Sequence, residues 1–264
     1  MKVDLSNIKQ RVTREVEFFD HQQSQRNRFE RGLAYLNKGI GWQRRNAAIC
    51  AAMRDAVGAR VLEIGSQSWE WCLFRYGYRP QQLTCINISQ SEIEIGRIQA
   101  AKLGMVCDFR KMDAHNLEFE DGSFDVVFGY AILHHLDFAR ALSEIHRVLR
   151  TGGKILFVEP LRHNPLARLV RWSTPNARTP DEFPLGRPEL RLLARNFKAD
   201  NYYSELFTVV GAVIAQRFYA TPVNPLTRLC DRLDDLLVRM TPFVGPYYRS
   251  VVIRGTKTTT AWQN

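Results

Sequence analysis

Several polar residues that could bind a ligand stand where short apolar runs of the sequence end. They occur in order along the chain at Glu63 to Ser66, Asn87-Ile88, Asp113-Ala114 and Gly129-Tyr130. A carboxylate can hold two neighbouring hydroxyls through charge-assisted hydrogen bonds. A glycine lets the backbone approach a ligand closely because it has no Cβ. The segment VLEIG, residues 61–65, therefore looks like the start of a nucleotide-binding loop.

Residues that could move a proton lie further along the chain. One of the adjacent His134 and His135 could act as a general base or position a substrate, while the other lines a pocket or packs the next helix. Glu159 could accept a proton or form an ion pair with Arg162, and His163 is a further candidate base. Adjacent histidine side chains diverge and no carboxylate cluster accompanies them, so we expect no metal site.

Strand and helix patterns alternate around these positions. Runs of strand type are expected at 60–65, 83–88, 105–113, 124–130 and 154–160. Apolar residues at helical spacing predict helices at 42–57, 69–75, 89–104 and 138–150. This alternation predicts a doubly wound, parallel sheet covered on both faces. Ligands of such sheets bind past the carboxyl ends of the strands.

The last hundred residues follow a different pattern. We expect helices at 165–173 and 188–197, a strand at 198–207, a largely helical stretch at 208–241 and a last strand at 247–257. Insertions at about 161–197 and 208–246 are predicted to cover the substrate side of a domain spanning 59–264, with 1–58 as a helical segment packed on it. The apolar segment 206–218 could be the packed core of a cover helix, wall a lipophilic pocket or touch a membrane surface.

The composition is that of an ordinary globular protein, with 45% hydrophobic and 24% charged residues in 264. The first ten residues lack the apolar core of a signal peptide, and no apolar run approaches the ~18 residues that span a bilayer. A cytoplasmic location is therefore expected. The five cysteines are odd in number and never spaced CxxC, which predicts reduced thiols.

Positive charge is in excess, with a formal net charge of +10. Residues 140–198 hold 12 Lys plus Arg against 5 Asp plus Glu. Such an excess attracts phosphorylated metabolites, acidic lipids or nucleic acid. Arg162, Arg168, Arg171 and Arg178 could surround an anionic substrate or form a solvated basic surface. No RNA-binding motif accompanies them, so nucleic acid is not the expected partner.

The stretch DAHNLEFEDGSFDVVFGYAILHHL, residues 113–136, with SEIHRVLRTGGKILFVEP, residues 143–160, resembles class I S-adenosylmethionine-dependent methyltransferases. The similarity is to their type 11 small-molecule group and covers about 100 residues, from Val61 to Pro160. It implies a Rossmann-like, three-layer α/β/α sandwich with a helical cover and a seven-stranded, mostly parallel sheet whose last strand is antiparallel. It also implies S-adenosylmethionine as cofactor and S-adenosylhomocysteine as product.

The resemblance assigns cofactor binding to the ends of the first four strands. In the family, the first strand ends in a glycine-rich loop around the amino-acid part of the cofactor, the second in an acid that binds the ribose, and the third in an aspartate that contacts the adenine amine. The fourth lines the methyl group. The corresponding residues here are Glu63, Gly65, Ser66, Gln67, Asn87, Ile88, Asp113, Ala114 and Tyr130.

The sequence departs from the family pattern at three of these strand-end positions. Gln67 and Trp69 replace the second and third glycines, and Asn87 replaces the ribose-binding acid. If the backbone at Gln67 has a positive φ, the side chain adds ~1 kcal/mol of strain. Asn87 can still accept and donate hydrogen bonds to hydroxyls. Trp69 stands at the start of a helix and is expected to pack behind the loop.

We therefore predict methyl transfer to oxygen, nitrogen or carbon of a small molecule such as a secondary metabolite, sugar or isoprenoid, either anionic or partly apolar. Tyr130 could orient this acceptor or form a pocket wall. The catalytic candidates are Tyr130, His134, His135, Glu159 and His163. Two alternatives stay open: a non-catalytic binding protein with this fold, and a cofactor-binding enzyme that catalyses a non-methylating step. The oligomeric state is not predicted.

Overall fold

The computed structural model describes residues 10, 13–14, 35, 38–65, 68–173, 182–259 and 262–263. Most of the predicted N-terminal helical segment therefore lies outside the described residues, and so do Ser66 and Gln67. The end of that segment is a helix, α3 (Ile40–Met53), which continues into the 3-10 turn η2 (Arg54–Ala56). The predicted helix at 42–57 is thus confirmed, with an earlier start.

The sheet has seven strands in the order β3-β2-β1-β4-β5-β7-β6. Their bounds are β1 (Arg60–Ile64), β2 (Gln82–Asn87), β3 (Asp108–Lys111), β4 (Phe124–Tyr130), β5 (Leu149–Pro160), β6 (Phe197–Ser204) and β7 (Ser250–Lys257). Strands β1 to β5 pair in parallel, whereas β7 is antiparallel to both β5 and β6. The predicted mostly parallel sheet with an antiparallel last strand is confirmed.

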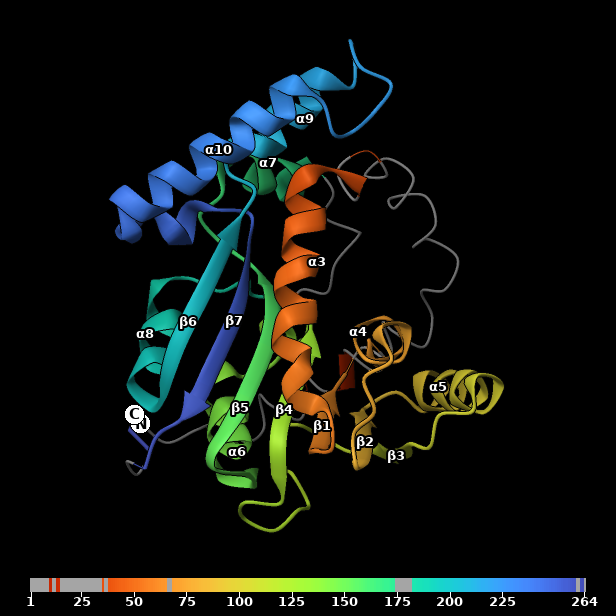
Figure 1. The fold of residues 1–264 in the computed structure, drawn as a ribbon. Coiled ribbons are helices and arrows are strands. Elements are labelled where there is room, and N and C mark those ends of the chain that lie inside the picture. Colours follow the sequence, from red (N-terminus) through yellow and green to blue (C-terminus); the bar gives the residue numbers. More distant parts are fainter. Residues whose placement is uncertain are drawn as a thin grey trace.

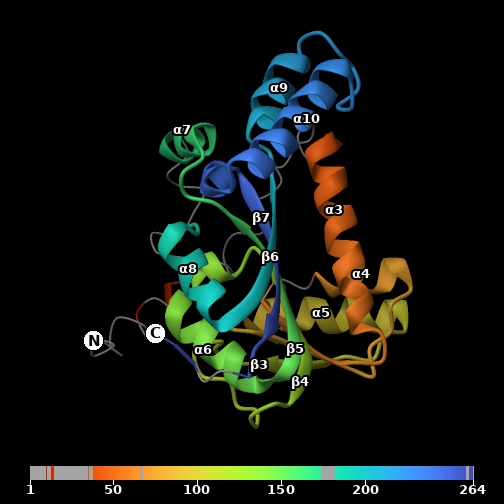
Figure 2. The same cartoon turned by 60° about the vertical axis from the view of Figure 1, so that its left-hand side comes forward.

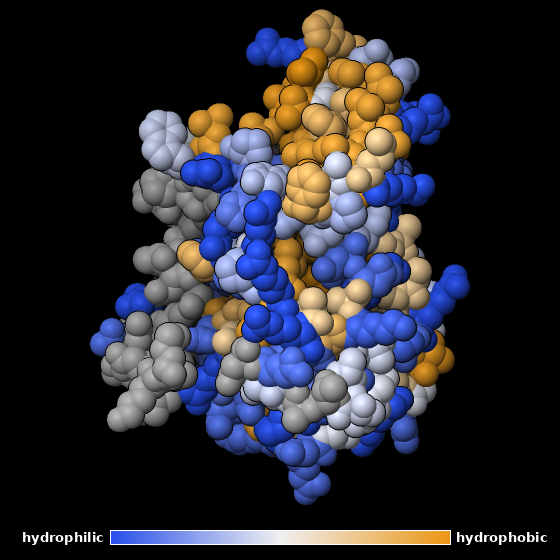
Figure 3. Space-filling view, turned by 90° about the vertical axis from the view of Figure 1, so that its left-hand side faces the viewer, coloured by the Kyte–Doolittle hydropathy of each residue, from blue (hydrophilic) through white to orange (hydrophobic). Residues whose placement is uncertain are grey.

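Helices cover both faces of this sheet. They are α4 (Trp69–Cys72), α5 (Gln90–Leu103), α6 (Phe138–Val148), α7 (Pro165–Ser173), α8 (Arg187–Asn196), α9 (Phe207–Ala215) and α10 (Pro225–Met240), with 3-10 turns η3 (Phe74–Tyr76), η4 (Leu133–His135) and η6 (Pro242–Tyr247). α3, α4 and α5 lie on one face, and α6 and α8 lie on the other (Figures 1 and 2). α9 and α10 lie at the carboxyl end of the parallel strands, where hydrophobic residues gather on the surface (Figure 3).

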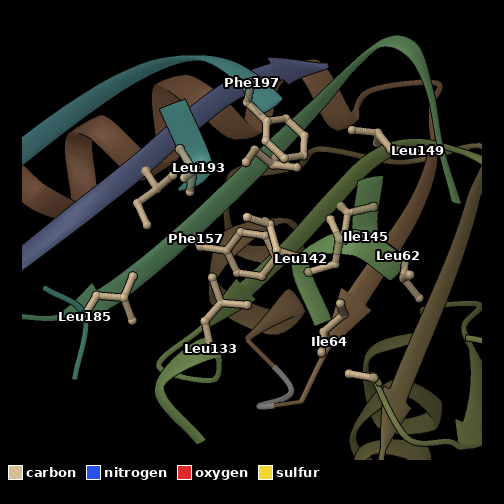
Figure 4. Close-up of a cluster of buried hydrophobic side chains, with 14 of the residues drawn as sticks. Leu62, Ile64, Leu133, Leu142, Ile145, Leu149, Phe157, Leu185, Leu193 and Phe197 are labelled. Carbon is tan, nitrogen blue, oxygen red and sulfur yellow. The ribbon is translucent and has the colours of Figure 1, made fainter. Parts of the chain in front are cut away.

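Two apolar cores follow from this layering, one on each face of the sheet. On the α6 and α8 side, Phe157 of β5 packs among Leu142, Ile145 and Leu193 (Figure 4). On the other side, α3, α4 and α5 contribute to a second cluster that includes the fully buried Trp69. The expectation that Trp69 packs behind the first loop is therefore confirmed.

Several strand boundaries differ from the sequence prediction, and the structure explains the starts of β3 and β5. β3 begins at Asp108 rather than at residue 105, because the preceding Val106 is 92% exposed and pairs with no strand. β5 begins at Leu149, inside the predicted helix, because Leu149 pairs with Phe124 before the register shifts at Val126. The predicted Thr151-Gly152-Gly153 turn survives as an irregularity within β5, where Gly152 has a φ of +72°.

A buried ion pair fixes α3 to the sheet. Arg45 of α3 donates from Nη1 to Oε2 of Glu205 at 2.9 Å and to Oγ of Ser250 at 3.1 Å. Arg249 donates to the same Glu205 oxygen at 2.9 Å. Glu205 follows β6 with a φ of +72°, which is strained for a residue other than glycine. The charge of Glu205 is thus balanced from two elements, and removal of either arginine would leave it poorly compensated.

His146, in the last turn of α6, is a buried histidine without a polar partner for Nε2 within the described part of the chain. Its ring packs edge-on against Phe197 and Trp262, with centroids 5.5 and 5.6 Å away. Burial, together with the nearby Lys257 ammonium, lowers the pKa of His146 to about 4. The folded protein therefore favours the neutral ring.

We expect His146 to make stability depend on pH. In the unfolded chain His146 has a pKa of ~6.5 and becomes protonated below that pH. In the folded chain it becomes protonated only near pH 4. The free energy of unfolding should therefore fall as the pH falls from about 6.5 towards 4. Urea unfolding at about pH 7.5 and pH 5 measures this loss, and His146→Phe should reduce it by about 2 kcal/mol. Identical pH dependence in wild type and variant would contradict the assignment.

Candidate active site

The turn that follows β1 begins at Gly65. Its φ of +93° lies in the region that favours glycine. Its N–H donates to the carbonyl of Ile86 at 2.8 Å, which continues the sheet pairing one residue beyond β1. A Cβ at Gly65 would lie 2.7 Å from the side chain of Ile132. Conformation and space therefore both require glycine here, as in a loop that approaches a ligand closely.

Glu63 holds the two ends of this turn together. Its buried carboxylate accepts hydrogen bonds from the backbone N–H of Ser68, from Ser68 Oγ at 2.7 Å and from Cys85 Sγ at 3.1 Å. Burial raises the pKa of Glu63, and the hydrogen bonds from Ser68 and Cys85 oppose that rise. Both oxygens face protein donors, one from the loop that leads into α4 and the other from β2.

Asn87, at the end of β2, is also engaged within the protein. Its Nδ2 donates to the carbonyl of Gly65 at 2.6 Å, and its Oδ1 accepts from the N–H of Ser89 at 2.9 Å. Ser89 in turn caps α5 by accepting from the N–H of Glu92. Asn87 therefore ties the Gly65 turn to the start of α5. An aspartate could not make the bond to Gly65, because a carboxylate has no donor.

Asp113 follows β3, and one oxygen of its carboxylate is hydrogen-bonded within the protein while the other is open to solvent. Oδ1 accepts from the backbone N–H of His115 at 2.9 Å and from His115 Nδ1 at 2.6 Å. The side chain is nevertheless 34% exposed. Burial raises the pKa of Asp113, but the hydrogen bonds from His115 outweigh it and leave the pKa below its usual value. An ionised carboxylate with one open oxygen suits a ligand that donates a hydrogen bond.

His115, which the sequence reasoning missed, connects Asp113 to α6. Its Nε2 accepts a hydrogen bond from the backbone N–H of Asp137 at 2.8 Å. Because a backbone N–H can only donate, Nε2 carries no proton and Nδ1 is the donor to Asp113. Asp137 caps α6 by accepting from the N–H of Arg140. The position of His115, two residues after Asp113, was the only signal for it in the sequence.

The ends of β4 and β5 bring Glu159 and His134 together. Oε1 of Glu159 accepts from the backbone N–H groups of Ile132 at 3.0 Å and Leu133 at 2.8 Å. Oε2 contacts Nδ1 of His134 at 2.7 Å. Both side chains are buried. Glu159 thus fixes the turn η4 and orients the ring of His134, in the way a carboxylate orients histidine in acid–base catalysis.

A second carboxylate, which the sequence reasoning did not use, faces the other side of this ring. Oε1 of Glu182 lies 3.8 Å from Nε2 of His134. The backbone carbonyl of His134 also accepts from the N–H of Phe183 at 2.7 Å. The chain after α7 therefore returns to the His134 turn, which places carboxylates on both sides of one buried imidazole.

Tyr130 ends β4 beside an aromatic residue of α4. The rings of Tyr130 and Trp71 meet edge to face with centroids 5.3 Å apart. The next residue, Ala131, has a φ of +54°, a strained conformation held by the hydrogen bond from its N–H to the carbonyl of Val158 at 2.8 Å. The Tyr130 side chain is half-buried against the α3 core, which agrees with a wall rather than a free hydroxyl.

The remaining candidates lie in other surroundings. The ring of His135 stacks on His134 with centroids 4.2 Å apart, whereas His163 contacts the ring of Tyr247 at 5.7 Å. Of the two alternatives left open for Glu159, the ion pair with Arg162 does not form. Arg162 forms its ion pair with Glu189 at 3.1 Å, because Glu159 is already surrounded by the η4 turn.

Two residues next to the strand ends have different exposures. Ile88 follows Asn87 half-buried, whereas Ala114 is buried in the core. Ala114 therefore offers its backbone, not a side chain, to the carboxyl edge of the sheet. Its contribution to a ligand site would be limited to main-chain contacts.

These residues fit S-adenosylmethionine in part. Gly65 gives the first turn the positive φ that a glycine loop needs, and the open oxygen of Asp113 can accept from an amine. Asn87 departs from the pattern, because both ends of its side chain already have partners. The carbonyl Oδ1 retains a second lone pair for a ribose hydroxyl. The residues expected at the glycine turn and at the adenine end of the cofactor are therefore present, while the contact expected with the ribose is reduced.

The fold is that of known methyltransferases. The geranyl diphosphate methyltransferase solved in complex with S-adenosylmethionine is 14% identical, with a TM-score of 0.56 over 81% of this chain and 84% of its own. YcgJ from Bacillus subtilis is 19% identical, with a TM-score of 0.53 over 81% of this chain and 97% of its own. At these identities the similarity shows the Rossmann-like methyltransferase fold.

A family model matches part of the sequence. Residues 62–157 match the type 11 family described as "Methyltransferase domain". Residues 62–157 of this chain therefore correspond to a class I S-adenosylmethionine-dependent methyltransferase domain, a type of domain for which S-adenosylmethionine is the typical methyl donor. The match runs from Leu62 in β1 to Phe157 in β5 and includes the ends of β1 to β4, whereas Glu159 at the end of β5 lies just beyond it.

Two curated relatives match over the same region. Demethylmenaquinone methyltransferase of Staphylococcus epidermidis is 31% identical over 114 residues, which are 42% of this chain and 47% of the relative. The C-methyltransferase UbiE of ubiquinone and menaquinone biosynthesis from Brucella abortus is 38% identical over 86 residues, 31% of each chain. The chain thus spans about half or less of these relatives' length.

Proposed function

We propose that this protein transfers the methyl group of S-adenosylmethionine to a partly apolar small molecule. The observation that carries the proposal is a row of groups across adjacent strand ends. Gly65, Asn87 and Asp113 form one part of this row, and the buried pair of His134 and Glu159 forms the other. The first part suits binding of a nucleoside and the second suits proton transfer. Cofactor binding and removal of the acceptor's proton could therefore take place at the same edge of the sheet.

When bound, the cofactor supplies an electrophilic methyl group on a sulfonium. The protein then has to align a nucleophile behind that methyl group and remove its proton. In our proposal, Nε2 of His134 takes the proton, because Nδ1 is held by Glu159. Glu159 orients the ring, and Glu182 at 3.8 Å favours the positive charge that develops on it. Tyr130 and Trp71 form an aromatic wall.

The proposed acceptor is a phenol or quinol that carries an apolar substituent. The relatives' names refer to demethylmenaquinone and to ubiquinone and menaquinone biosynthesis. The edge-to-face rings of Tyr130 and Trp71 suit an aromatic acceptor. Incubation with S-adenosylmethionine and a panel of phenols and quinols tests this, with S-adenosylhomocysteine formation as the readout. Turnover of polar amines or sugars alone would contradict the acceptor class.

Asp113→Asn should weaken cofactor binding about 10- to 100-fold. The asparagine oxygen can still accept both bonds from His115, so the fold is retained. The open oxygen, however, becomes an NH2 group that meets the donor of adenine. Calorimetric titration with S-adenosylmethionine and S-adenosylhomocysteine measures the change.

A matched control for this substitution is Asp108→Asn, in the same strand region. The Asp108 carboxylate is exposed and pairs with Arg110. Its replacement should leave cofactor affinity unchanged. Equal affinity of wild type and Asp113→Asn would remove Asp113 from the site. A folded wild-type protein that binds neither ligand would overturn the proposed function itself.

A further inference from the structure

α9 turns an apolar face to the outside of the molecule. Its exposed residues are Phe207, Val210, Val213 and Ile214, between 42% and 49% exposed. The other side of the helix is buried and includes Gly211, whose added Cβ would lie 2.6 Å from Cys230 of α10. α9 therefore packs on α10 with one side while its outward side remains hydrophobic. Phe218, 77% exposed, extends this surface past the helix end.

α10 continues the same kind of surface. Its exposed apolar residues Leu229, Leu233, Leu236 and Met240 fall within an arc of about 60° at 100° per residue. The exposed Arg228, Arg232 and Arg239 fall in the adjacent arc of about 40°. The helix thus presents a hydrophobic row beside an arginine row. We call these two rows, with the exposed residues of α9, the docking surface.

Every acidic residue of segment 207–247 is paired with a cation or hydrogen-bonded within the protein. Asp231 and Asp235 pair with Arg44 of α3 at 2.7 and 2.5 Å. Asp234 is buried and accepts hydrogen bonds from the N–H groups of residues 206–208 at the start of α9. The charges left outside are all positive, at Arg217 and the arginine row.

From this segregation we propose that the docking surface binds the face of an anionic lipid bilayer. An apolar row that enters the headgroup boundary next to arginines that meet acidic headgroups is the pattern of an interfacial helix. A second copy of this chain fits less well, because a symmetric contact would place arginine rows together without facing acids. Among the described residues, no helix has both the length and the hydrophobicity to cross the bilayer.

Position in the fold supports this orientation. α9 begins three residues after β6 ends, at the same edge of the sheet as Pro160 of β5 and Ser250 of β7. Hydrophobic residues gather at this end of the molecule (Figure 3). A protein docked in this way would hold the carboxyl ends of its strands next to the membrane. The inference does not depend on the proposed function, because it concerns binding alone.

Co-sedimentation of the full chain with lipid vesicles tests the proposal. The probes are vesicles of phosphatidylcholine alone and of phosphatidylcholine with about 30% phosphatidylglycerol. We expect binding to the anionic vesicles, weakened by added salt because the arginines are exposed to screening. The triple variant Arg228→Gln, Arg232→Gln, Arg239→Gln should bind about 100-fold more weakly. The triple variant Leu229→Ser, Leu233→Ser, Leu236→Ser should lose binding to a similar degree.

A matched control distinguishes binding through the docking surface from binding through the overall positive charge of the protein. Lys102→Gln, Arg191→Gln and Lys198→Gln together remove three exposed positive charges elsewhere and should leave vesicle binding within about twofold. Cofactor affinity and melting temperature should be unchanged in the α10 variants, which distinguishes lost docking from misfolding. Equal loss in the control triple variant would overturn the proposal. So would a stable dimer in solution that buries α10 and is broken by the leucine variant.

Discussion

Replacing Glu159 with alanine is expected to lower the free energy of unfolding by about 3 to 5 kcal/mol. The change leaves two buried N–H donors, those of Ile132 and Leu133, without their acceptor, and it removes the partner of His134. Each buried donor left unsatisfied costs about 1 to 3 kcal/mol. Chemical unfolding followed by circular dichroism measures the loss. A destabilisation below about 1 kcal/mol would show that the η4 turn does not depend on this carboxylate.

Glu159→Gln separates stability from catalysis. The amide oxygen can still accept from Ile132 and Leu133, while the amide NH2 group faces His134 and favours the opposite tautomer. We expect near-normal stability with methyl transfer reduced at least 100-fold, since Nε2 then holds the proton it should receive. Cofactor affinity should remain unchanged. Full activity in this variant would show that His134 does not act as the base.

The second large effect is expected at Gly65. Gly65→Ala should destabilise the protein by about 2 to 5 kcal/mol and weaken cofactor binding at least tenfold. A φ of +93° costs an alanine about 1 to 2 kcal/mol, and the Cβ would lie 2.7 Å from Ile132, which adds about 1 to 3 kcal/mol of overpacking. Thermal unfolding and calorimetric titration measure the two effects.

Gly104→Ala is the matched control for Gly65. Gly104 has a φ of +63° with open space around it, so its substitution carries the backbone strain without the clash. Combining Gly65→Ala with Ile132→Ala should recover part of the stability lost by Gly65→Ala alone, because the two side chains no longer compete for one space. Strictly additive effects of the two substitutions would argue against contact between these positions.

The sequence predicted the sheet well because its signals are local. Runs such as 124–130 and helices such as 165–173 combine apolar spacing with clear turn residues, and both have the predicted bounds. The start of β5 was missed because Leu149 reaches strand pairing through Phe124, a contact between distant parts of the chain. Helix spacing alone cannot report such a contact, so the predicted helix ran two residues too far.

The site was harder to predict for a similar reason. Strand ends located Gly65, Asn87 and Asp113, since the carboxyl edge of a parallel sheet gathers them. The direction of each side chain depends on partners far away in sequence. Asn87 turns to Gly65, Glu159 to the η4 turn, and His115 joins Asp113 to Asp137. No spacing in the chain indicates these partners, and no local pattern predicts the position of Glu182 between α7 and α8.

The hydrogen bonds from Asp137 through His115 to Asp113 run in one direction only. The first donor is the main-chain N–H of Asp137, so the imidazole of His115 must accept a hydrogen bond at Nε2 and donate one from Nδ1. The carboxylate at the end is therefore left with an oxygen that has no proton to offer. A purine with an amino group at this position can donate a hydrogen bond to the carboxylate. A purine with a carbonyl there, such as hypoxanthine or guanine, would place two acceptor oxygens against each other. In our proposal, the choice between nucleobases is thus set by the hydrogen-bond direction at the start of α6, at a distance from the base itself.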